Sequence, residues 1–528
     1  LCYLKEINEI GACRICCVEV EGESRLVSSC NNLVYEGMVV HTNSHRALEA
    51  RRINVELLLS QHDGECSICV RAGNCKLQQV ANNFGLLKNP YKKDLPNRIW
   101  TETFPLYRNV QKCIKCMRCV QVCDRVQDMH IWDIAGTGSR TTIDVSRNRH
   151  ITETECTYCG QCITHCPTAG LVERDDTSPV FDALKDPDRI TVVQIAPAVR
   201  AAWAEAFNLS PQFATVKRMV SALRQIGFDY VFDTNFAADL TIMEESAELV
   251  KKLEKGDNKY PLFTSCCPGW IRFAETKHPE LLPYISTCRS PMEMFGAVIK
   301  EYYKPADKEA GLETVSVAVM PCVAKKYEAA RPEFVRDGVP DVDYVITTKE
   351  LISMIRELGI QFNELEPGSP DMPFSISSGS GVIFGVTGGV MEAALRKVAD
   401  KSDFAMKEIE YSGIRGMDGV KKAEVTLGDK TLRLGVVNGL GNADRLIELI
   451  ENGEEHFDFV EVMACPYGCI AGAGQPFSHK SDKARRSQGM YKADKSAVIK
   501  CSDENPVVRE LYEYGLLKDR AHELLHTK

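Results

Sequence analysis

Residues 113–123 read Cys-Ile-Lys-Cys-Met-Arg-Cys-Val-Gln-Val-Cys, and residues 156–167 read Cys-Thr-Tyr-Cys-Gly-Gln-Cys-Ile-Thr-His-Cys-Pro. Both runs have the spacing Cys-x2-Cys-x2-Cys-x3-Cys. In this pattern three close thiolates hold one 4Fe–4S cube, and the fourth cysteine reaches the cube of the other run. Zinc ribbons are the alternative, but they use two cysteine pairs per metal rather than two quartets. We therefore expect one cluster on Cys113, Cys116, Cys119 and Cys166, and a second on Cys156, Cys159, Cys162 and Cys123.

The composition supports metal ligation over disulfides. The chain has 528 residues, 44% of them hydrophobic, with a net charge of −9 and 23 cysteines. Cysteines grouped as Cys-x-x-Cys indicate metal sites, and thiolate ligands imply a reducing compartment, which we expect to be the cytoplasm. The first residue is Leu1 rather than Met, so we expect an incomplete N-terminus that could have carried a targeting segment. The acidic balance argues against nucleic acid as a partner, and no apolar run is long enough to span a bilayer.

Two further metal sites precede these runs. His62, Cys66, Cys69 and Cys75 have the spacing His-x3-Cys-x2-Cys-x5-Cys. One imidazole and three thiolates can close a tetrahedron around zinc or hold a 4Fe–4S cube, and spacing alone does not choose between them. The second group consists of Cys2, Cys13, Cys16 and Cys30, and it indicates a 2Fe–2S cluster on a loop of a small β-rich domain. Because Cys17 directly follows Cys16, the spacing alone does not decide which of these two is the ligand.

The hydrophobic pattern divides the chain. Strand-like alternation at residues 17–20, 26–29 and 38–41 gives way to a mostly helical stretch over 46–85 and a Lys- and Pro-rich linker over 86–108. From about residue 176, apolar runs alternate with amphipathic segments, as in an α/β domain. We expect strands at 190–195, 262–265, 315–320, 344–347, 432–437 and 457–463, and helices at 216–226, 240–255, 349–358 and 390–398.

Three separated cysteine motifs follow predicted strands in this C-terminal region. They are Thr-Ser-Cys-Cys-Pro-Gly-Trp at 264–270, Met-Pro-Cys-Val-Ala-Lys at 320–325 and Met-Ala-Cys-Pro-Tyr-Gly-Cys at 463–469. The carboxyl ends of parallel strands are where open α/β sheets place their sites. The alternative is scattered buried thiols, since free cysteine is often a core residue. The shared setting instead predicts one composite metal site.

Together these motifs resemble the multi-cluster FeFe hydrogenases of anaerobic bacteria, over essentially the whole chain. The resemblance implies a multidomain α+β and α/β architecture with four parts: a partial ferredoxin-like β-grasp 2Fe–2S domain (1–45), a small His-ligated 4Fe–4S domain with its linker (46–108), a bacterial-ferredoxin-like domain with two 4Fe–4S clusters (109–175), and a large α/β catalytic domain with two sheet lobes around the active site (176–528). It also favours a 4Fe–4S cluster at His62 and a 2Fe–2S cluster at Cys2.

The family's active-site residues can be carried over by position. Cys267, Cys322, Cys465 and Cys469 match the ligands of its active-site 4Fe–4S cube, with Cys469 bridging to a diiron subsite that bears CO, cyanide and an azadithiolate. Together these groups form the H-cluster. Lys325 matches a residue that pairs with a cyanide ligand. The resemblance also implies a set of pocket-lining positions, which could equally be ordinary core: Pro197, Met320, Phe384, Val390 and Met463.

The resemblance further implies a proton path. Cys266 matches the thiol that passes protons to the subsite amine, and a general acid must lie within hydrogen-bond reach with an accessible pKa. Glu245 and Glu248 lie three apart on a predicted helix and so share a face; with Ser286 they match the rest of the path. Taken alone, a glutamate pair on a helix is usually a solvated face. Lys252 stands where the family has Arg, and both side chains carry a positive charge.

The expected activity is the reversible conversion of two protons and two electrons into hydrogen. We expect a ferredoxin or flavodoxin as the electron partner, maturation proteins to supply the diiron subsite, and a monomeric stand-alone enzyme. The alternatives are a non-catalytic relative in iron–sulfur assembly or electron transfer, and a hydrogen sensor; such assembly relatives typically lose Cys266 and Lys325, which are present here. Two departures from the family pattern are Tyr467 and Ala473, where glycine is common.

Overall fold

Two units of the chain each have their own set of internal contacts in the computed structural model. The first comprises residues 1–156 and 160–174, and the second comprises residues 157–159 and 175–528. The structure describes residues 1–86, 88–91, 95, 99–207, 209, 215–256, 259–399, 409, 413–427, 430–478 and 480–527. Part of the predicted linker, at 87, 92–94 and 96–98, lies outside these residues.

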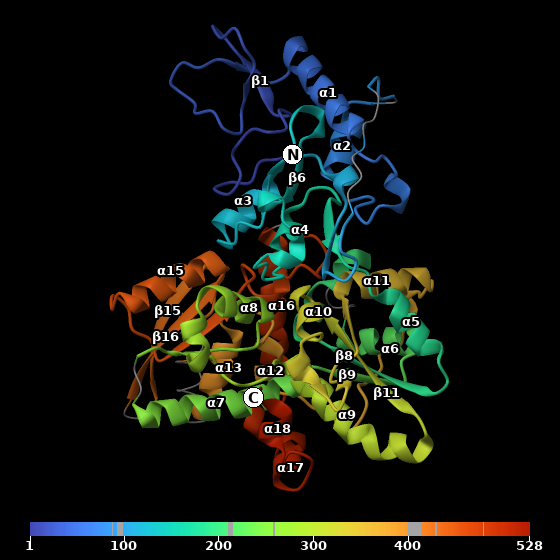
Figure 1. The fold of residues 1–528 in the computed structure, drawn as a ribbon, viewed down its shortest axis with the longest axis vertical. Helices are drawn as coiled ribbons and strands as arrows, with labels where there is room; N and C mark the ends of the chain where they lie inside the picture. The colour runs from blue at the N-terminus through green and yellow to red at the C-terminus, as the bar shows by residue number, and fades with distance from the viewer. Residues whose placement is uncertain are drawn as a thin grey trace. The chain divides into compact units, whose positions relative to one another are not determined.

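The first unit is built from short elements joined by cysteine-bearing loops (Figure 1). Its N-terminal sheet is antiparallel with the order β2-β1-β3, and two further antiparallel pairs join β4 to β7 and β5 to β6. Its strands are β1 (Cys17–Val20), β2 (Val27–Ser28), β3 (Val40–His41), β4 (Leu106–Arg108), β5 (Trp132–Ala135), β6 (Thr142–Val145) and β7 (Leu171–Glu173). Its α-helices are α1 (His45–Ser60), α2 (Lys76–Asn83), α3 (Arg118–Arg125) and α4 (Gln161–His165).

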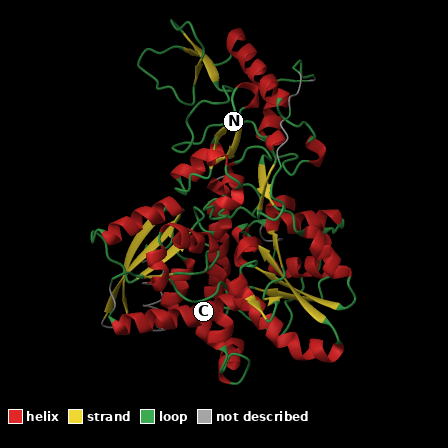
Figure 2. Ribbon diagram, in the orientation of Figure 1, coloured by secondary structure: helices red, strands yellow, loops and turns green. Residues whose placement is uncertain are grey.

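The second unit contains two four-stranded sheets (Figure 2). The first sheet has the order β14-β11-β8-β9, and all its neighbours are parallel. Its strands are rich in Val and Ile and are buried almost throughout, as expected for a parallel sheet covered on both faces. They are β8 (Arg189–Ile195), β9 (Tyr230–Asp233), β11 (Glu313–Met320) and β14 (Tyr344–Thr347).

The second sheet has the order β10-β17-β16-β15. β10, β17 and β16 run parallel, while β15 pairs antiparallel with β16 at one edge. The strands are β10 (Leu262–Phe263), β15 (Val420–Leu427), β16 (Lys430–Asn438) and β17 (Phe459–Met463). A small hairpin of β12 (Val335–Arg336) and β13 (Val339–Pro340) lies outside both sheets.

Helices of the second unit lie between and around the two sheets, which are well separated in Figure 2. α7 packs against α9 and α13, and α12 packs against α16. The α-helices are α5 (Thr177–Lys185), α6 (Val216–Ile226), α7 (Asn235–Lys255), α8 (Pro268–Lys277), α9 (Pro291–Ala310), α10 (Ala324–Glu328), α11 (Thr348–Glu357), α12 (Gly379–Ile383), α13 (Gly389–Val398), α15 (Leu440–Glu451), α16 (Lys480–Ser496), α17 (Pro506–Glu513) and α18 (Ala521–Leu525).

The predicted strands and helices of the catalytic region are confirmed, with ends shifted by a few residues. The mostly helical stretch expected over 46–85 is confirmed as two helices, α1 and α2, separated by the loop that carries Cys66, Cys69 and Cys75. Strands β9 and β15 were not predicted. Among the described residues, every helix falls short of the length and apolar character that crossing a bilayer requires.

Candidate active site and cluster sites

Four cysteines of the second unit line one cavity. Cys267 follows β10, Cys322 follows β11, and Cys465 and Cys469 follow β17. The three strands belong to both sheets, so the cavity lies where the carboxyl ends of two parallel arrays meet. The lining is mainly apolar, with prolines, methionines and Phe384 around the four thiols.

The donor set fits an iron–sulfur cube. Burial raises the pKa of Cys267, raises that of Cys322 to about 12, and raises that of Cys465 well above its usual range. The charges of neighbouring cysteines in the group raise the pKa values of Cys322 and Cys465 further. For Cys267, the remaining interactions lower the pKa and offset part of the effect of burial. A coordinating thiol is deprotonated by its metal, so a cluster bound among these four converging thiols would stabilise the thiolates that burial disfavours.

Two glycines allow the chain to close around this cavity. A Cβ added to Gly472 would lie 2.2 Å from the carbonyl oxygen of Pro321, and one added to Gly474 would lie 2.9 Å from Thr347. The intervening Ala473 is buried without any such conflict. Alanine at this position therefore leaves the close approach intact.

Cys266 lies in the same cavity, next to the ligand group. It is 9% exposed, and burial followed by the charge of Glu245 raises the pKa of its thiol well above the usual range. Glu245 is fully buried on α7 and accepts a hydrogen bond from the backbone N–H of Ser265 at 3.4 Å. Burial, with the nearby charge of Glu248, raises the pKa of Glu245 to about 8. Both the Cys266 thiol and the Glu245 carboxyl therefore favour their protonated forms at neutral pH.

Lys325 also lines the cavity, from α10. Its Nζ donates to Oε2 of Glu328 at 2.5 Å and to the carbonyl oxygen of Cys266 at 3.4 Å. Burial alone would lower the pKa of Lys325, but the Glu328 carboxylate outweighs burial and the pKa is raised. A charged ammonium therefore faces the cavity.

Four of the five predicted pocket residues line the cavity: Pro197, Met320, Phe384 and Met463. Val390, on α13, is fully buried in the adjoining core cluster and does not belong to the lining. Tyr467 does not belong to it either. Its backbone is left-handed, with φ of 74°, which explains why glycine is common here, and Nζ of Lys483 lies 5.0 Å from its ring centroid.

A polar network continues from Glu245 toward the C-terminus. Ser286 forms side-chain hydrogen bonds with Glu245 and Glu248, and each bond favours the charged carboxylate. For Glu245 this effect is smaller than that of burial, so its pKa stays raised. Beyond Glu248, the Oγ1 of Thr287 lies 2.8 Å from Nδ1 of His526, and Nε2 of that ring lies 3.0 Å from Oε2 of Glu244. Burial alone would raise the pKa of Glu248, but its hydrogen bonds, led by that from His526, lower it.

Sequence reasoning missed His526. Its ring lies in this network because Thr527 donates its backbone N–H and its hydroxyl to the carbonyl oxygen of Thr287, 240 positions earlier in the chain. No local pattern signals such a pairing. Lys252, one turn beyond Glu248 on α7, has its Nζ 5.2 Å from the ring centroid of Tyr284.

In the first unit, two predicted ligand sets each line a single cavity. Cys113, Cys116, Cys119 and Cys166 surround one, which matches the exchange of fourth cysteines between the two runs. His62, Cys66, Cys69 and Cys75 surround another, together with Lys112 and Arg71. Of the second predicted cube, Cys123, Cys156 and Cys162 are buried in this unit, whereas Cys159 belongs to the other.

The N-terminal cysteines form two interacting pairs. The thiols of Cys2 and Cys13 are hydrogen-bonded, as are those of Cys16 and Cys30. The neighbouring Cys17 is the first residue of β1 and directs its Sγ to the carbonyl oxygen of Ala47 at 3.8 Å. The geometry therefore favours Cys16 over Cys17 in the ligand set.

A cavity of four thiols in an α/β unit, with further thiol-lined cavities in a separate unit, defines an iron–sulfur oxidoreductase. Residues 189–473 match the family model "Iron only hydrogenase large subunit, C-terminal domain", and residues 474–528 match "Iron hydrogenase small subunit". Residues 1–45, 51–90 and 112–169 match, in turn, a 2Fe–2S cluster binding domain, an NADH-ubiquinone oxidoreductase-G iron-sulfur binding region and a 4Fe–4S dicluster domain.

Similar proteins give the same assignment. The chain is 44% identical to the NADP-reducing hydrogenase subunit HndD of Solidesulfovibrio fructosivorans, over all of this chain and 93% of the relative. It is 38% identical to iron hydrogenase 1 of Clostridium pasteurianum, over all of this chain and 94% of the relative. Among solved structures, HydA1 of Chlamydomonas reinhardtii matches with 40% identity and a TM-score of 0.59, covering 66% of this chain and 98% of that one.

The chain belongs to the iron-only (FeFe) hydrogenases. Its activity is the interconversion of molecular hydrogen with protons and electrons, and its catalytic domain is accompanied by iron–sulfur domains of the 2Fe–2S and 4Fe–4S types. The expected hydrogenase function is confirmed, and the alternative of an iron–sulfur assembly protein is less well supported.

Proposed function

We propose that Cys267, Cys322, Cys465 and Cys469 hold the cube of the H-cluster and that Cys469 bridges it to the diiron subsite. The observation that carries this assignment is that all four line one apolar cavity at the ends of three strands. When bound, the diiron subsite supplies the iron chemistry that makes and cleaves hydrogen.

Protein groups then supply the protons. We assign Cys266 as the proton donor and acceptor at the cavity, since it is the cavity-lining thiol outside the ligand set. Glu245, Ser286 and Glu248 carry the proton onward. The raised pKa of Glu245 supports this role, because a relay group works best when its pKa lies near the operating pH.

Lys325 and the apolar lining orient and protect the subsite. The buried ammonium of Lys325 offers a hydrogen bond and a positive charge to an anionic ligand such as cyanide. Pro197, Met320, Phe384 and Met463 shape the cavity and exclude water. Val390 supports this lining from the core behind it.

We assign the electron route to three accessory 4Fe–4S clusters and one 2Fe–2S cluster. The ligands are the two quartets of the ferredoxin-like runs, the His62 group, and Cys2, Cys13, Cys16 and Cys30. The thiol-lined cavities around Cys113 and around His62 support two of these sets. We retain the domain boundaries at residues 45, 108 and 175, maturation proteins as the source of the diiron subsite, and a monomeric enzyme as proposals.

The electron partner is proposed to be a ferredoxin or flavodoxin. The similarity to a subunit of an NADP-reducing hydrogenase favours a second candidate, a nicotinamide-linked assembly in which another subunit receives the electrons. An assay of hydrogen oxidation by the isolated chain distinguishes these two candidate electron partners. Direct reduction of ferredoxin at a rate matching that of a small redox dye supports the first; ferredoxin that stays oxidised while the dye is reduced favours the second.

The proton assignment is tested by loading the purified chain with a synthetic diiron subsite under strict anaerobiosis and measuring hydrogen evolution. The variant Cys266→Ala should lose activity by about 10²–10⁴-fold or more, the range for removal of a general acid. Cys501→Ala is the matched control, since Cys501 is also buried but lies outside the cavity. Infrared bands of the CO and cyanide ligands verify subsite uptake in each protein. A Cys266→Ala enzyme with full uptake and unchanged activity would overturn the assignment.

A further inference from the structure

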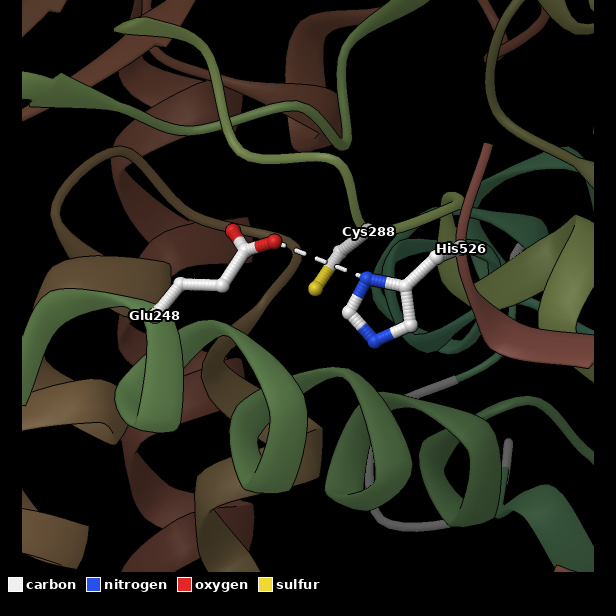
Figure 3. Close-up of side chains that lie close together, drawn as sticks. All are labelled: Glu248, Cys288 and His526. Atoms are coloured by element: carbon white, nitrogen blue, oxygen red, sulfur yellow. Dashed lines mark ion pairs between the residues drawn. The ribbon is translucent and has the colours of Figure 1, made fainter. Parts of the chain in front are cut away.

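Three different donor groups meet beside the proton path. Glu248 comes from α7, Cys288 from the segment before α9, and His526 from the segment after α18. One ligand atom from each lies within 4.8 Å of the others (Figure 3). Cys288 and His526 are buried and Glu248 is half-buried. Cys288 has no part in the cluster sites or in the assigned proton route.

The backbone holds two of these groups in place. Cys288 and His526 form an antiparallel β-bridge. The N–H of Arg289 donates to the carbonyl oxygen of Leu525 at 2.8 Å, and the N–H of Thr527 donates to that of Thr287 at 2.8 Å. Directly opposed residues of an antiparallel pair carry their side chains on the same face. The thiol and the imidazole are therefore presented together toward Glu248.

This combination of donors suits a borderline divalent cation. Thiolate, imidazole and carboxylate are the three ligand types that Zn²⁺ binds, at roughly 2.3, 2.0 and 2.0 Å in a tetrahedron. Such bond lengths separate the ligand atoms by roughly 3.3–3.6 Å. Nδ1 of His526 and Oε1 of Glu248 are 3.5 Å apart. The Cys288 sulfur needs only a small movement to complete the triangle.

We propose that Glu248, Cys288 and His526 form a binding site for Zn²⁺ or a cation of similar chemistry, and that the bound cation withdraws Glu248 from proton transfer. The second half rests on the proposed proton route. The fourth position is left to water or to the Thr287 hydroxyl, which lies 2.8 Å from the His526 ring nitrogen.

The net charge of the site stays the same when Zn²⁺ replaces two protons. In the metal-free protein the imidazole is paired with Glu244 and Glu248, and although burial alone would lower its pKa, these pairs raise the pKa of His526 to about 9. An imidazolium, a neutral thiol and the Glu248 carboxylate sum to zero. Binding of Zn²⁺ releases the imidazolium proton and the thiol proton, so the neutral imidazole, thiolate, carboxylate and dication again sum to zero. The buried site thus takes up the cation without gaining net charge.

Several charged or titratable groups lie around His526 and Cys288 and influence how readily these two side chains release their protons to Zn²⁺. α7 contributes Glu244 and Glu248, and Tyr512 of α17 donates to Glu244 at 2.5 Å. The ring of His522, on α18, stacks on that of His526 with centroids 4.9 Å apart, and the guanidinium of Arg289 donates to the His526 carbonyl oxygen at 3.0 Å.

The test titrates the holoenzyme, carrying its clusters and the diiron subsite, with ZnCl₂ against a chromophoric zinc chelator. We expect one equivalent to bind with a dissociation constant on the order of 1 µM or lower. Cys288→Ala and His526→Gln should each weaken binding by about 100-fold or more, since even the loss of an outer-shell partner costs 10–100-fold. His522→Gln and Cys501→Ala, a neighbouring imidazole and an equally buried thiol, should leave it unchanged.

Zinc X-ray absorption gives an independent readout. One sulfur at about 2.3 Å with nitrogen and oxygen neighbours supports the site. Two or more sulfurs, or undiminished binding in Cys288→Ala, would mean that zinc has entered a cluster site, and the proposal fails. Iron content is measured alongside to detect cluster loss.

Hydrogen evolution distinguishes the two halves of the proposal. Activity that falls at least 10-fold on zinc binding, returns with chelator, and resists zinc in Cys288→Ala supports the block. Tight binding that leaves the rate unchanged overturns the block. An enzyme already inactive before zinc is added would count against the proposed function instead, because binding is measured without turnover.

Discussion

The proposed cluster sites of the first unit and the proposed active-site cavity of the second are both lined by cysteines, but these cysteines are brought together in opposite ways. Around Cys113 the ligands come mostly from one short loop, and Lys115 and Met117 between them adopt left-handed backbone. In the second unit, Cys267 and Cys469 lie about 200 residues apart and meet because two sheets direct their strand ends to one place. A local site is formed by its loop, whereas a composite site is formed by the whole fold.

The hydrophobic cores of the two units also differ in how much they depend on cysteines. The hydrophobic cluster of the first unit that includes Leu77 and Ile114 also contains three cysteines, Cys2, Cys13 and Cys116. The second unit has three large clusters made almost entirely of aliphatic and aromatic side chains. The first unit therefore depends on its metals for stability far more than the second does.

The largest expected effect tests this dependence. Removing iron from the full chain with a chelator under reducing conditions should speed amide exchange in α1 and α3 by at least roughly 10³-fold, because metal binding supplies much of their folding energy. Strands β8, β11 and β17 should keep their protection. Equal loss of protection in both units would contradict the comparison.

A substitution at the cavity tests the role of close backbone approach. Gly472→Ala should destabilise the second unit by about 1–3 kcal/mol, since the new Cβ meets the Pro321 carbonyl oxygen at 2.2 Å. Diiron uptake should fall as well. Ala473→Gly, one residue away, is the control and should cost less than about 1 kcal/mol. Chemical denaturation monitored by the fluorescence of Trp203 and Trp270 gives both values; similar losses in the two variants would sink the idea.

The buried carboxyl of α7 should make the second unit sensitive to pH. Glu245 has a pKa near 8 when folded and 4.5 in its ordinary state. The folded chain therefore holds a proton that the unfolded chain has lost, so stability is fully present below pH 4.5 and declines as pH rises toward 8. Between pH 6 and pH 8 the decline is about 2 kcal/mol.

Glu245→Gln should remove that slope, because glutamine does not titrate. Denaturation at the two pH values, compared between the variant and the parent, measures the difference. Glu244→Gln provides a contrast, since burial would raise the pKa of Glu244 but its pairing with His526 lowers it. If the parent and Glu245→Gln show the same pH dependence, Glu245 is not protonated when folded.

The smallest effect concerns Tyr467. Glycine at this position relieves about 1–2 kcal/mol of left-handed strain, but it adds flexibility to the unfolded chain at about 0.5–1 kcal/mol. It also loses the contact with Lys483. Tyr467→Gly should thus shift stability by less than about 1 kcal/mol and leave hydrogen evolution within about threefold. A large rise in activity would show that the ring obstructs the cavity.

The comparison also explains what could be predicted from the sequence. The exchange of Cys166 into the first quartet follows from spacing, because the site is local. The four cysteines of the cavity in the second unit could be grouped because each motif follows an apolar run, yet their arrangement across two sheets was expected only from the family resemblance. His526 could not be found at all: its partners are Glu244 and Glu248, more than 270 residues earlier.

The ion pair between Lys325 and Glu328 has a consequence for how the cavity selects its contents. The ammonium is already satisfied by a carboxylate at 2.5 Å and by the carbonyl of Cys266. A neutral guest would gain nothing by approaching it, whereas an anionic one can compete with Glu328 for the same charge. The pair therefore keeps a positive charge available at the wall of an apolar cavity without adding net charge while no anion is bound.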